Sequence, residues 1–406
     1  MVTIKDSVHD HITVEGVAET LLDTPPVQRL RRVRQLGTVS LVYPSANHTR
    51  FEHSLGVYHL ACEALAHLDV ADRDAERVRA AALLHDVGHA PYSHTVEELV
   101  HRHTGKYHDD VRDLVCHGPV ADALEDGGLS PSRVADLIAG EGTHGQLVAG
   151  ELDVDRMDYL VRDAHHTGVP YGTIDHGRLV RALRFVDGAL VLDEGNVQTA
   201  ESLLLARALM TPTVYAHHVA RISKSMFRRA TEALVADGLD AERLHRMDDA
   251  ELQVALRADD APTTLGSRLA DRRLFKRAVW AEAGDVPTDV RDADHGTVRA
   301  FERDVADAAD VDREHVVVDV PAEPDMQEST TRVLVNGEVR RLDQQSTLVS
   351  ALRTARREQW RLGVYAPRDA VDRVGRAAER VLGLETDGAL VTEVGTPGLA
   401  TLDQFE

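Results

Sequence analysis

An apolar helical run that ends in a histidine and an aspartate constrains this chain more than any other stretch. Residues from Ala80 to Leu84 have the composition of a buried helix, and His85-Asp86 follows directly. A buried histidine beside a buried aspartate costs free energy unless each has a partner, and one divalent cation would satisfy both. A hydrogen-bonded pair in the core is the alternative for these two residues alone. The stretch predicts a helical core with polar chemistry at a helix end.

Histidines concentrate around this stretch. Eleven of the 22 lie between His48 and His117, where random placement would put about four. His53 follows a loop and is expected to begin a helix, whereas His85 is expected to end one. Four others lack such a context and are expected on the surface or in packing: His59, His67, His101 and His103. The chemistry of the chain is therefore expected in this region.

A second dense stretch of polar residues runs from Gly150 to Asp163. On a helix, Asp155, Tyr159 and Asp163 are spaced i, i+4 and i+8, so they share one edge, and Arg156 lies partly on it. Such an edge is either a salt-bridged exterior or, beside a metal pocket, a set of ligand and substrate contacts. We favour the second interpretation because of the histidines upstream.

Four residues from these stretches form a mixed nitrogen and oxygen donor set: His53, His85, Asp86 and Asp155. Two neutral imidazoles and two carboxylates cancel the charge of one divalent ion and suit a metal of borderline hardness. The sequence leaves the identity of the metal open among Mn, Fe, Ni, Co, Zn and Mg.

Local patterns predict a mainly α-helical fold with short hairpins and a small C-terminal α/β appendage. A strand pair is expected from Ile4 to Val14, an extended segment from Leu41 to Pro44, and a hairpin around Asp187-Gly188. Helices are expected through most of residues 16–237, with a break near Pro212. We expect three parts: a catalytic core over 1–237, an acidic helical extension over 238–313, and the α/β region over 314–406. In the last part, strands are expected at 316–318 and 331–342, and helices at 346–362 and 368–382.

The composition limits where the protein works and what it binds. Its hydrophobic fraction of 43% is ordinary, and no apolar run reaches the roughly 18 residues of a membrane span, so we expect a cytoplasmic protein and no membrane partner. Two cysteines, Cys62 and Cys116, fit a reducing compartment. The net charge of -22 disfavours nucleic acid as a partner. The chain has only four lysines, at Lys5, Lys106, Lys224 and Lys276, among abundant Asp and Arg, so we hypothesise a halophilic protein.

Three motifs resemble those of the HD-domain phosphohydrolases, in the branch that cleaves deoxynucleoside triphosphates (dNTPs) to deoxynucleoside and triphosphate. They are RFEHSLGV from Arg50, HDVGHAPYSH from His85 and DVDRMDY from Asp153. The resemblance is close over about residues 1–235 and loose in the tail. It implies a helical HD-domain core over 1–237, a divalent metal ion, a dNTP substrate, and a homo-oligomer, either a dimer or a tetramer.

The resemblance also implies a role for each matching residue. The implied metal ligands are His53, His85, Asp86 and Asp155. The implied catalytic residues are His94 as general acid, Glu97 as the carboxylate that orients it, and His89 and His108 at the α-phosphate. The implied substrate contacts are Arg50, Arg156, Tyr159 and Arg207 to the triphosphate, Gln35 and Asp163 to the sugar 3′-hydroxyl, and Leu36 and Tyr215 against the 2′ carbon.

Two positions depart from the family pattern, since Ala216 replaces a glutamine of the vertebrate member and Arg156 replaces a lysine. Two alternatives to dNTP cleavage stay open. One is an HD-domain phosphohydrolase that acts on another nucleotide or a phosphodiester, and the other is a non-catalytic nucleotide-sensing HD protein.

Overall fold

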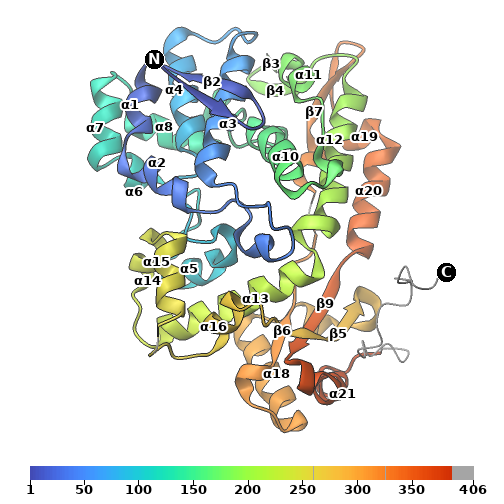
Figure 1. The fold of residues 1–406 in the computed structure, drawn as a ribbon. Coiled ribbons are helices and arrows are strands. Elements are labelled where there is room, and N and C mark those ends of the chain that lie inside the picture. The colour runs from blue at the N-terminus through green and yellow to red at the C-terminus, as the bar shows by residue number, and fades with distance from the viewer. Residues whose placement is uncertain (259, 325, 386–406) are drawn as a thin grey trace, which may run out of the picture. The chain divides into compact units, whose positions relative to one another are not determined.

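The computed structural model describes residues 1–258, 260–324 and 326–385 (Figure 1). The described chain is mainly α-helical with small sheets, which confirms the predicted fold class. Contacts divide it into two compact units. Unit 1 holds residues 1–220, 227–267 and 326–355, and unit 2 holds 221–226, 268–324 and 356–385. The division into independently organised parts over 1–237, 238–313 and 314–406 stays a prediction.

The chain begins with the predicted hairpin, formed by β1 (Val2–Asp6) and β2 (Asp10–Val14). The strands are antiparallel, and Asp6 pairs with Asp10 at the turn. Ile12 and Val14 are fully buried while Thr13 between them is exposed, which is the alternation of a half-buried strand. Three short helices follow: α1 (Val17–Leu22), α2 (Pro25–Arg29) and the 3-10 helix η1 (Leu30–Arg32).

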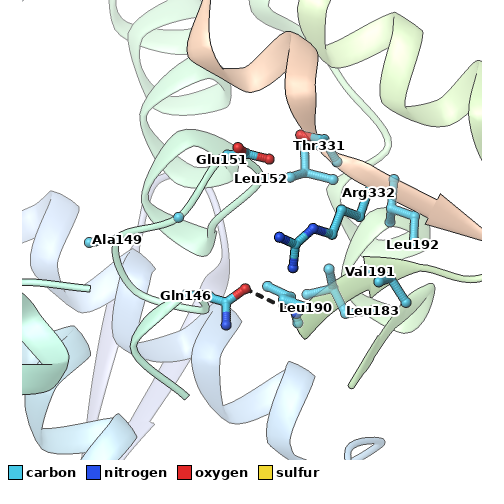
Figure 2. Close-up of a pocket in the computed structure, with 11 residues that line it drawn as sticks. Gln146, Ala149, Glu151, Leu152, Leu183, Leu190, Val191, Leu192, Thr331 and Arg332 are labelled. Carbon is cyan, nitrogen blue, oxygen red and sulfur yellow. Dashed lines mark hydrogen bonds between the residues drawn. The ribbon is translucent and has the colours of Figure 1, made fainter. Parts of the chain in front are cut away.

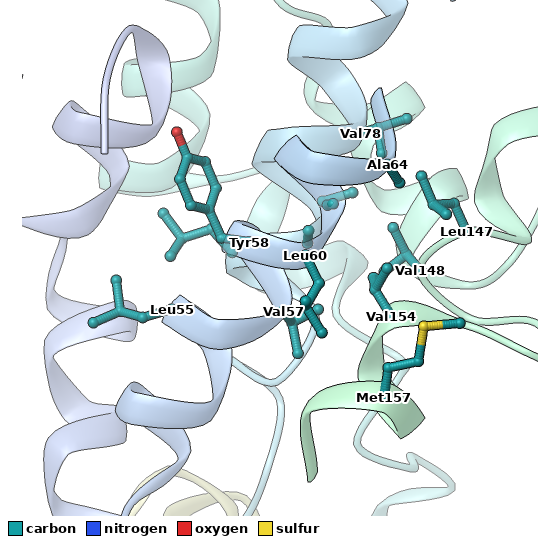
Figure 3. Packing of buried hydrophobic residues seen from close by; sticks show 14 of the residues in the cluster. Leu55, Val57, Tyr58, Leu60, Ala64, Val78, Leu147, Val148, Val154 and Met157 are labelled. Carbon is teal, nitrogen blue, oxygen red and sulfur yellow. The ribbon is translucent and has the colours of Figure 1, made fainter. Parts of the chain in front are cut away.

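Helix α3 (Arg50–Leu65) is central to unit 1 and packs against α4 (Asp72–Leu84) and α10 (Val154–Thr167). It begins with a capping box, in which Thr49 and Glu52 satisfy each other's backbone N–H groups. A helix buried around most of its circumference belongs in a core rather than on a surface. Figure 3 shows its packing through Leu55, Val57, Tyr58 and Leu60, with Val78 from α4 and Met157 from α10 nearby.

Further helices complete the part of the chain before β5. They are η2 (Gly37–Leu41), η3 (Ser93–Thr95), α5 (Glu97–Thr104), α6 (Arg112–Val115), α7 (Gly118–Asp126), α8 (Pro131–Ile138), α9 (Gly142–Gly145), η4 (Pro170–Gly172), α11 (His176–Arg181), α12 (Val197–Met210), the π-helical turn η5 (Thr211–Tyr215), α13 (His218–Ala236), α14 (Ala241–Arg246), α15 (Asp249–Leu256) and α16 (Leu265–Ala270). The turn η5 contains Pro212, so the long helical region breaks where the sequence predicts.

A four-stranded sheet in unit 1 has the order β3 (Leu183–Val186), β4 (Ala189–Leu192), β7 (Arg332–Val335) and β8 (Glu338–Arg341). Asp187 and Gly188 both have positive φ, as a two-residue hairpin turn requires. Strands β4 and β7 run parallel and pair at Leu192 and Val333. The 3-10 helix η8 (Gln327–Thr330) precedes β7, and α19 (Leu342–Gln345) and α20 (Thr347–Glu358) follow the sheet.

Unit 2 has its own sheet, in which β9 (Arg361–Ala366) lies between β5 (Lys276–Glu282) and β6 (Val317–Asp319), all antiparallel. Helices α18 (His295–Ala309) and α21 (Val371–Leu382) pack on it and enclose a separate apolar core. The remaining short helices are η6 (Ala283–Asp285), α17 (Thr288–Arg291), η7 (Arg313–His315) and η9 (Arg368–Ala370).

Three local predictions are wrong. Residues 41–44, expected as extended, form a turn because the backbone N–H groups of Val42 and Tyr43 both donate to Val39 O. Strand β5 lies within the segment expected to be helical, since pairing with β9 and burial of Val279 outweigh its helical composition. Strand β9 begins at Arg361, so it includes the last two residues of the helix predicted over 346–362.

Cys62 and Cys116 are both free thiols. None of the helices in the described ranges combines the length and apolar composition that a membrane span needs.

Candidate active site

Two histidines from different helices turn the same ring nitrogen toward one point. His53 lies in the first turn of α3, and His85 follows the last residue of α4, so the contact between these helices brings the rings together. Their Nε2 atoms are 3.3 Å apart. The Nδ1 atom of His53 donates to Asp158 Oδ2 over 2.7 Å, and that of His85 to Ala82 O over 2.9 Å. These bonds engage Nδ1 of each ring and leave Nε2 as the nitrogen that faces the shared point, where it could bind a metal after losing its proton.

Two carboxylates complete this group. Asp155 Oδ1 is 2.9 Å from His53 Nε2 and 3.9 Å from His85 Nε2. Asp86 Oδ1 is 3.4 Å from His85 Nε2, and its Oδ2 is 3.8 Å from His53 Nε2. The four residues predicted as metal ligands thus converge, and we call them the HD cluster.

The donor set of the HD cluster fits a divalent cation. Burial alone would lower the pKa of His53, but hydrogen bonds to Asp155 and Asp158 outweigh it and raise the pKa to about 10. Burial would raise the pKa of Asp86, yet Arg50, His85 and His89 hold it well below its usual range. The cluster thus concentrates negative charge around two imidazoles, which a cation bound by their Nε2 atoms would neutralise.

A second group of donors adjoins the first. Glu97, at the start of α5, accepts from His94 Nδ1 over 2.7 Å and from His108 Nδ1. The ring of His89 stacks on that of His108 with centroids 4.2 Å apart, and His89 Nε2 lies 3.2 Å from Asp86 Oδ1. Side-chain exposure is 60% for His94 and 1% for His89, so His94 presents its ring to the solvent side. The four predicted catalytic residues therefore form one group, and His89 joins it to the HD cluster.

Glu97 is ionised in this arrangement. Burial would raise its pKa, but the hydrogen bonds from His108 and His94 dominate and hold the pKa well below the usual range. A carboxylate that accepts from Nδ1 orients the imidazole and leaves Nε2 as the reactive atom.

The loop between His85 and His94 is held in an unusual conformation. Tyr92 and Ser93 have backbone φ values of 55° and 54°, which residues other than glycine rarely adopt. The backbone N–H of Tyr92 donates to Asp249 Oδ1 over 2.6 Å, and the other carboxylate oxygen accepts from Arg34 N. Buried Asp249 thus fixes the backbone just before His94, and strained backbone of this kind is common at functional sites.

Gly88 is required in the same loop by a close approach. A Cβ at this position would lie 2.1 Å from His108 O. The glycine therefore lets the backbone of His108 reach the loop, which brings its ring onto His89. Only a residue without a side chain allows this contact.

The predicted triphosphate contacts lie around these groups. Arg50 is buried, and it donates from Nη1 to Asp86 Oδ2 and from Nε to Ser93 Oγ, each over 2.7 Å. Burial raises the pKa of Tyr159 to about 12, an effect opposed by the nearby charges of Arg207 and Arg156. Tyr159 is thus close to both arginines, although they come from different helices.

Of the predicted sugar contacts, Tyr215 binds Asp163 directly and Gln35 adjoins them. Asp163 Oδ2 accepts from the Tyr215 hydroxyl over 2.9 Å, and its Oδ1 accepts from His48 Nε2 over 2.8 Å. Gln35 adjoins this group because its backbone N–H donates to His48 O, and its side-chain Oε1 is buried with no hydrogen-bond partner among the described residues. Leu36 packs, half-buried, against the core.

Several residues at the site were not predicted. Asp158 and Arg162 stand behind His53, Asp249 supports the loop, and His48 orients Asp163. The spacing of Asp158 and Arg162 at i and i+4 is a recognisable ion-pair signal. For His48 and Asp249 the partners lie about a hundred residues or more away, and no local pattern marks them.

A separate cavity of about 330 Å³ lies between the β3–β4 hairpin, residues 146–152 and the start of β7 (Figure 2). Its walls include Leu183, Leu190 and Leu192, and Arg332 extends toward it. None of the predicted site residues lines it.

Two family models match the chain: the HD domain over residues 50–163 and the HD associated region over residues 174–393. The uncharacterized protein MJ1154 of Methanocaldococcus jannaschii is 32% identical over 381 residues, which cover 91% of this chain and 80% of that protein. The deoxynucleoside triphosphate triphosphohydrolase SAMHD1 homolog of Dictyostelium discoideum is 31% identical over 257 residues, which cover 57% of this chain and 49% of that protein. This chain therefore spans about half the length of that relative.

A solved structure agrees with these matches. The crystal structure of a phosphohydrolase from Bacteroides thetaiotaomicron has a TM-score of 0.73 and 25% identity, covering 90% of this chain and 100% of that one. The HD domain match begins at Arg50 and ends at Asp163, so it spans every residue of the HD cluster and of the group around Glu97. The chain belongs to the HD-domain family of phosphohydrolases.

Proposed function

We propose that this protein hydrolyses dNTPs at the α-phosphate and releases the deoxynucleoside and intact triphosphate. The observation that carries the proposal is the junction of two groups through His89, which contacts Asp86 of the HD cluster and stacks on His108 beside Glu97. One group suits a divalent cation, and the other presents a carboxylate-supported imidazole. A metal ion and a general acid each accelerate hydrolysis of a phosphoester with a poor leaving group.

His53, His85, Asp86 and Asp155 would hold the cation. A bound divalent ion polarises a phosphoryl oxygen and lowers the pKa of a coordinated water, which supplies hydroxide near neutral pH. Arg50 donates to Asp86 and would reach the same phosphate, because its guanidinium has further N–H groups to offer.

His94 would protonate the leaving group. A water molecule that has lost one proton to the solvent forms a bond to the α-phosphorus, and the bond from phosphorus to the 5′ oxygen breaks. That oxygen takes the proton from His94 Nε2, and the solvent then returns a proton to His94. Glu97 holds the Nδ1 side of the ring at 2.7 Å, so the imidazole keeps its orientation while Nε2 gains and loses the proton. The exposure of His94 gives a substrate access to it.

Arginines would neutralise the triphosphate. The chain carries a net charge of -22, so a ligand with about four negative charges needs local positive groups. The charges of Arg156 and Arg207 both lower the pKa of Tyr159, so these two arginines lie near that residue, and Arg50 donates to Asp86 of the HD cluster. Guanidinium groups bind phosphate oxygens through two parallel hydrogen bonds, which favours arginine here.

Deoxyribose would lie at Asp163. Its carboxylate, held by His48 and Tyr215, can accept from a 3′-hydroxyl, and the buried Oε1 of Gln35 is a further acceptor close to His48. The SAMHD1 homolog of Dictyostelium discoideum is named a deoxynucleoside triphosphate triphosphohydrolase, which supports the same substrate class.

The proposal is tested by incubating the metal-loaded protein with each of the four dNTPs and four NTPs and separating the products by chromatography. We expect deoxynucleoside and triphosphate in equal amounts, and no monophosphate. The control is the same protein stripped of metal with a chelator. Release of pyrophosphate or of a nucleoside monophosphate would show another HD-domain phosphohydrolase activity. Binding of a nucleotide without turnover would indicate a sensor.

A further inference from the structure

A buried carboxylate stands directly behind the HD cluster, on the side away from the point where the two Nε2 atoms meet. Asp158 lies in α10, one turn after Asp155, and is fully buried. Its Oδ2 accepts from His53 Nδ1 over 2.7 Å. The ring of His53 is therefore held on one side by Asp158 and presents the opposite nitrogen to the cluster.

Asp158 is itself immobilised by three other hydrogen bonds. Arg162 donates from Nε to Oδ2 over 2.9 Å and from Nη2 to Oδ1 over 3.0 Å. His9 Nε2, from the turn between β1 and β2, lies 2.7 Å from Oδ1. With the bond from His53, both oxygens are fully engaged, so this carboxylate cannot turn to become a metal ligand or leave the ring of His53 without breaking several bonds.

The same network continues into the N-terminal hairpin. Arg162 has no exposed surface and also donates from Nη1 to Asp6 Oδ2 over 2.9 Å. Asp6 Oδ1 accepts from the backbone N–H groups of Val8 and His9. The turn of the hairpin is thus shaped by Asp6, which is tied through Arg162 to Asp158.

We propose that Asp158 is a positioning residue for the metal site, and that Arg162, Asp6 and His9 make the N-terminal hairpin part of that site. A carboxylate on Nδ1 fixes the tautomer in which Nε2 is free and raises the basicity of that nitrogen. The role of the hairpin is to keep the carboxylate in place. The inference rests on the metal site of the proposed function and not on the choice of substrate.

The chain offers a matched control for this network in unit 2. Asp319 is a buried carboxylate that accepts from Arg221 Nε over 2.8 Å and from the Tyr365 hydroxyl over 2.7 Å. Asp319→Asn therefore perturbs the same kind of buried ion pair without any hydrogen bond to the HD cluster. We expect Asp319→Asn to lower folding stability about as much as Asp158→Asn does. We expect it to leave metal binding unchanged, unlike Asp158→Asn.

The test measures the dissociation constant of Co²⁺ by competition with a chromophoric chelator, for the wild type, Asp158→Asn and Asp319→Asn. We expect Asp158→Asn to bind Co²⁺ about 10 to 100-fold more weakly and to change the visible spectrum of the bound ion, because the ring of His53 is less well held. Asp319→Asn should match the wild type in both. Equal Co²⁺ affinity and an unchanged spectrum in Asp158→Asn would overturn the inference.

Two milder variants keep the test decisive if Asp158→Asn does not fold. Asp6→Asn and His9→Gln each remove one support of the network, and we expect each to weaken Co²⁺ binding by at least about threefold. Affinities equal to that of the wild type would show that the hairpin has no part in the metal site. Absence of Co²⁺ binding by the wild type would instead contradict the metal site itself, and therefore the proposed function.

Discussion

His85 and His94 lie in adjoining groups of the candidate active site, but their removal should have different consequences. His85→Ala deletes one nitrogen donor of the HD cluster, and Asp86→Ala deletes one oxygen donor. We expect either variant to lose stoichiometric divalent metal and, with it, hydrolysis, because a partial ligand set leaves the opposing charges unbalanced. Metal analysis of purified protein checks this, with exposed His103→Ala as the control. Full metal content in both variants would contradict the assignment of the cluster.

In the proposed mechanism, His94→Ala removes a proton donor and not a ligand. We expect metal content near that of the wild type and turnover lower by roughly 10² to 10⁴-fold, which is the range for loss of a general acid. The measurements are kcat and metal content on the same preparation. Loss of metal in this variant would make His94 a ligand and would contradict its assignment as the general acid.

Sugar choice is expected to depend on Leu36 and Tyr215. If both side chains face the 2′ carbon, a ribonucleotide hydroxyl loses its water and gains no partner, which costs about 1 to 3 kcal/mol. We therefore expect dGTP to be preferred over GTP by at least about tenfold in kcat/KM. Leu36→Ala and Tyr215→Phe should narrow that ratio, because the first opens space and the second frees an oxygen of Asp163. If the variants are less stable but keep the same ratio of kcat/KM for dGTP and GTP, the two residues contribute to core packing and not to sugar choice.

At the scale of helices and strands, the proposed metal site depends on the contact between α3 and α10. Gly56 is a position of close approach between these helices, since a Cβ there would lie 1.9 Å from Asp158 Oδ1 and 2.5 Å from Arg162 Nη2. Gly56→Ala is expected to lower the free energy of unfolding by about 1 to 3 kcal/mol, the usual cost of overpacking. It should also weaken metal binding, because it displaces the carboxylate behind His53.

Urea unfolding of Gly56→Ala and of Gly296→Ala provides the comparison. Gly296 lies in α18, where the nearest atom to an added Cβ is 3.6 Å away, so alanine should be neutral or stabilising there. Equal stability of the two variants would mean that α3 and α10 can separate without cost, contrary to the packing described here.

The elements were predictable where their signals are local. The apolar run before His85, the turn at Asp187-Gly188 and the edge formed by Asp155, Tyr159 and Asp163 all depend on neighbours in the sequence, and the structure has each of them. Strand β5 was missed because pairing with β9, some eighty residues later, decides its conformation. The left-handed backbone at Tyr92 was missed for the same reason, since Asp249 supports it.

In the candidate site, too, the contacts between residues distant in the sequence could not be predicted. Motif residues could be assigned from the family resemblance, and the structure brings the four expected donors of the HD cluster together. The residues that hold them in place could not be assigned. Asp6 and His9 are far from Asp158 in the sequence, and only the fold reveals that a hairpin turn reaches the back of His53.

The charge of the whole molecule suggests a salt dependence. With a net charge of -22, repulsion between carboxylates destabilises the compact state, and this repulsion is screened at molar salt, where the Debye length is about 3 Å. We expect the free energy of unfolding to rise between 0.1 M and 2 M KCl. Denaturant titrations at both concentrations check this. A lower stability at 2 M would contradict the hypothesis of a halophilic protein.

The central claim is that two adjoining groups of residues direct water to the α-phosphate of a dNTP. Hydrolysis of dGTP in ¹⁸O-labelled water by the metal-loaded protein, with mass spectrometry of both products, tests it most directly. Attack at the α-phosphorus predicts one ¹⁸O atom in the triphosphate and none in the deoxyguanosine. Label in the nucleoside, label in a monophosphate, or no turnover with any divalent metal would contradict the claim.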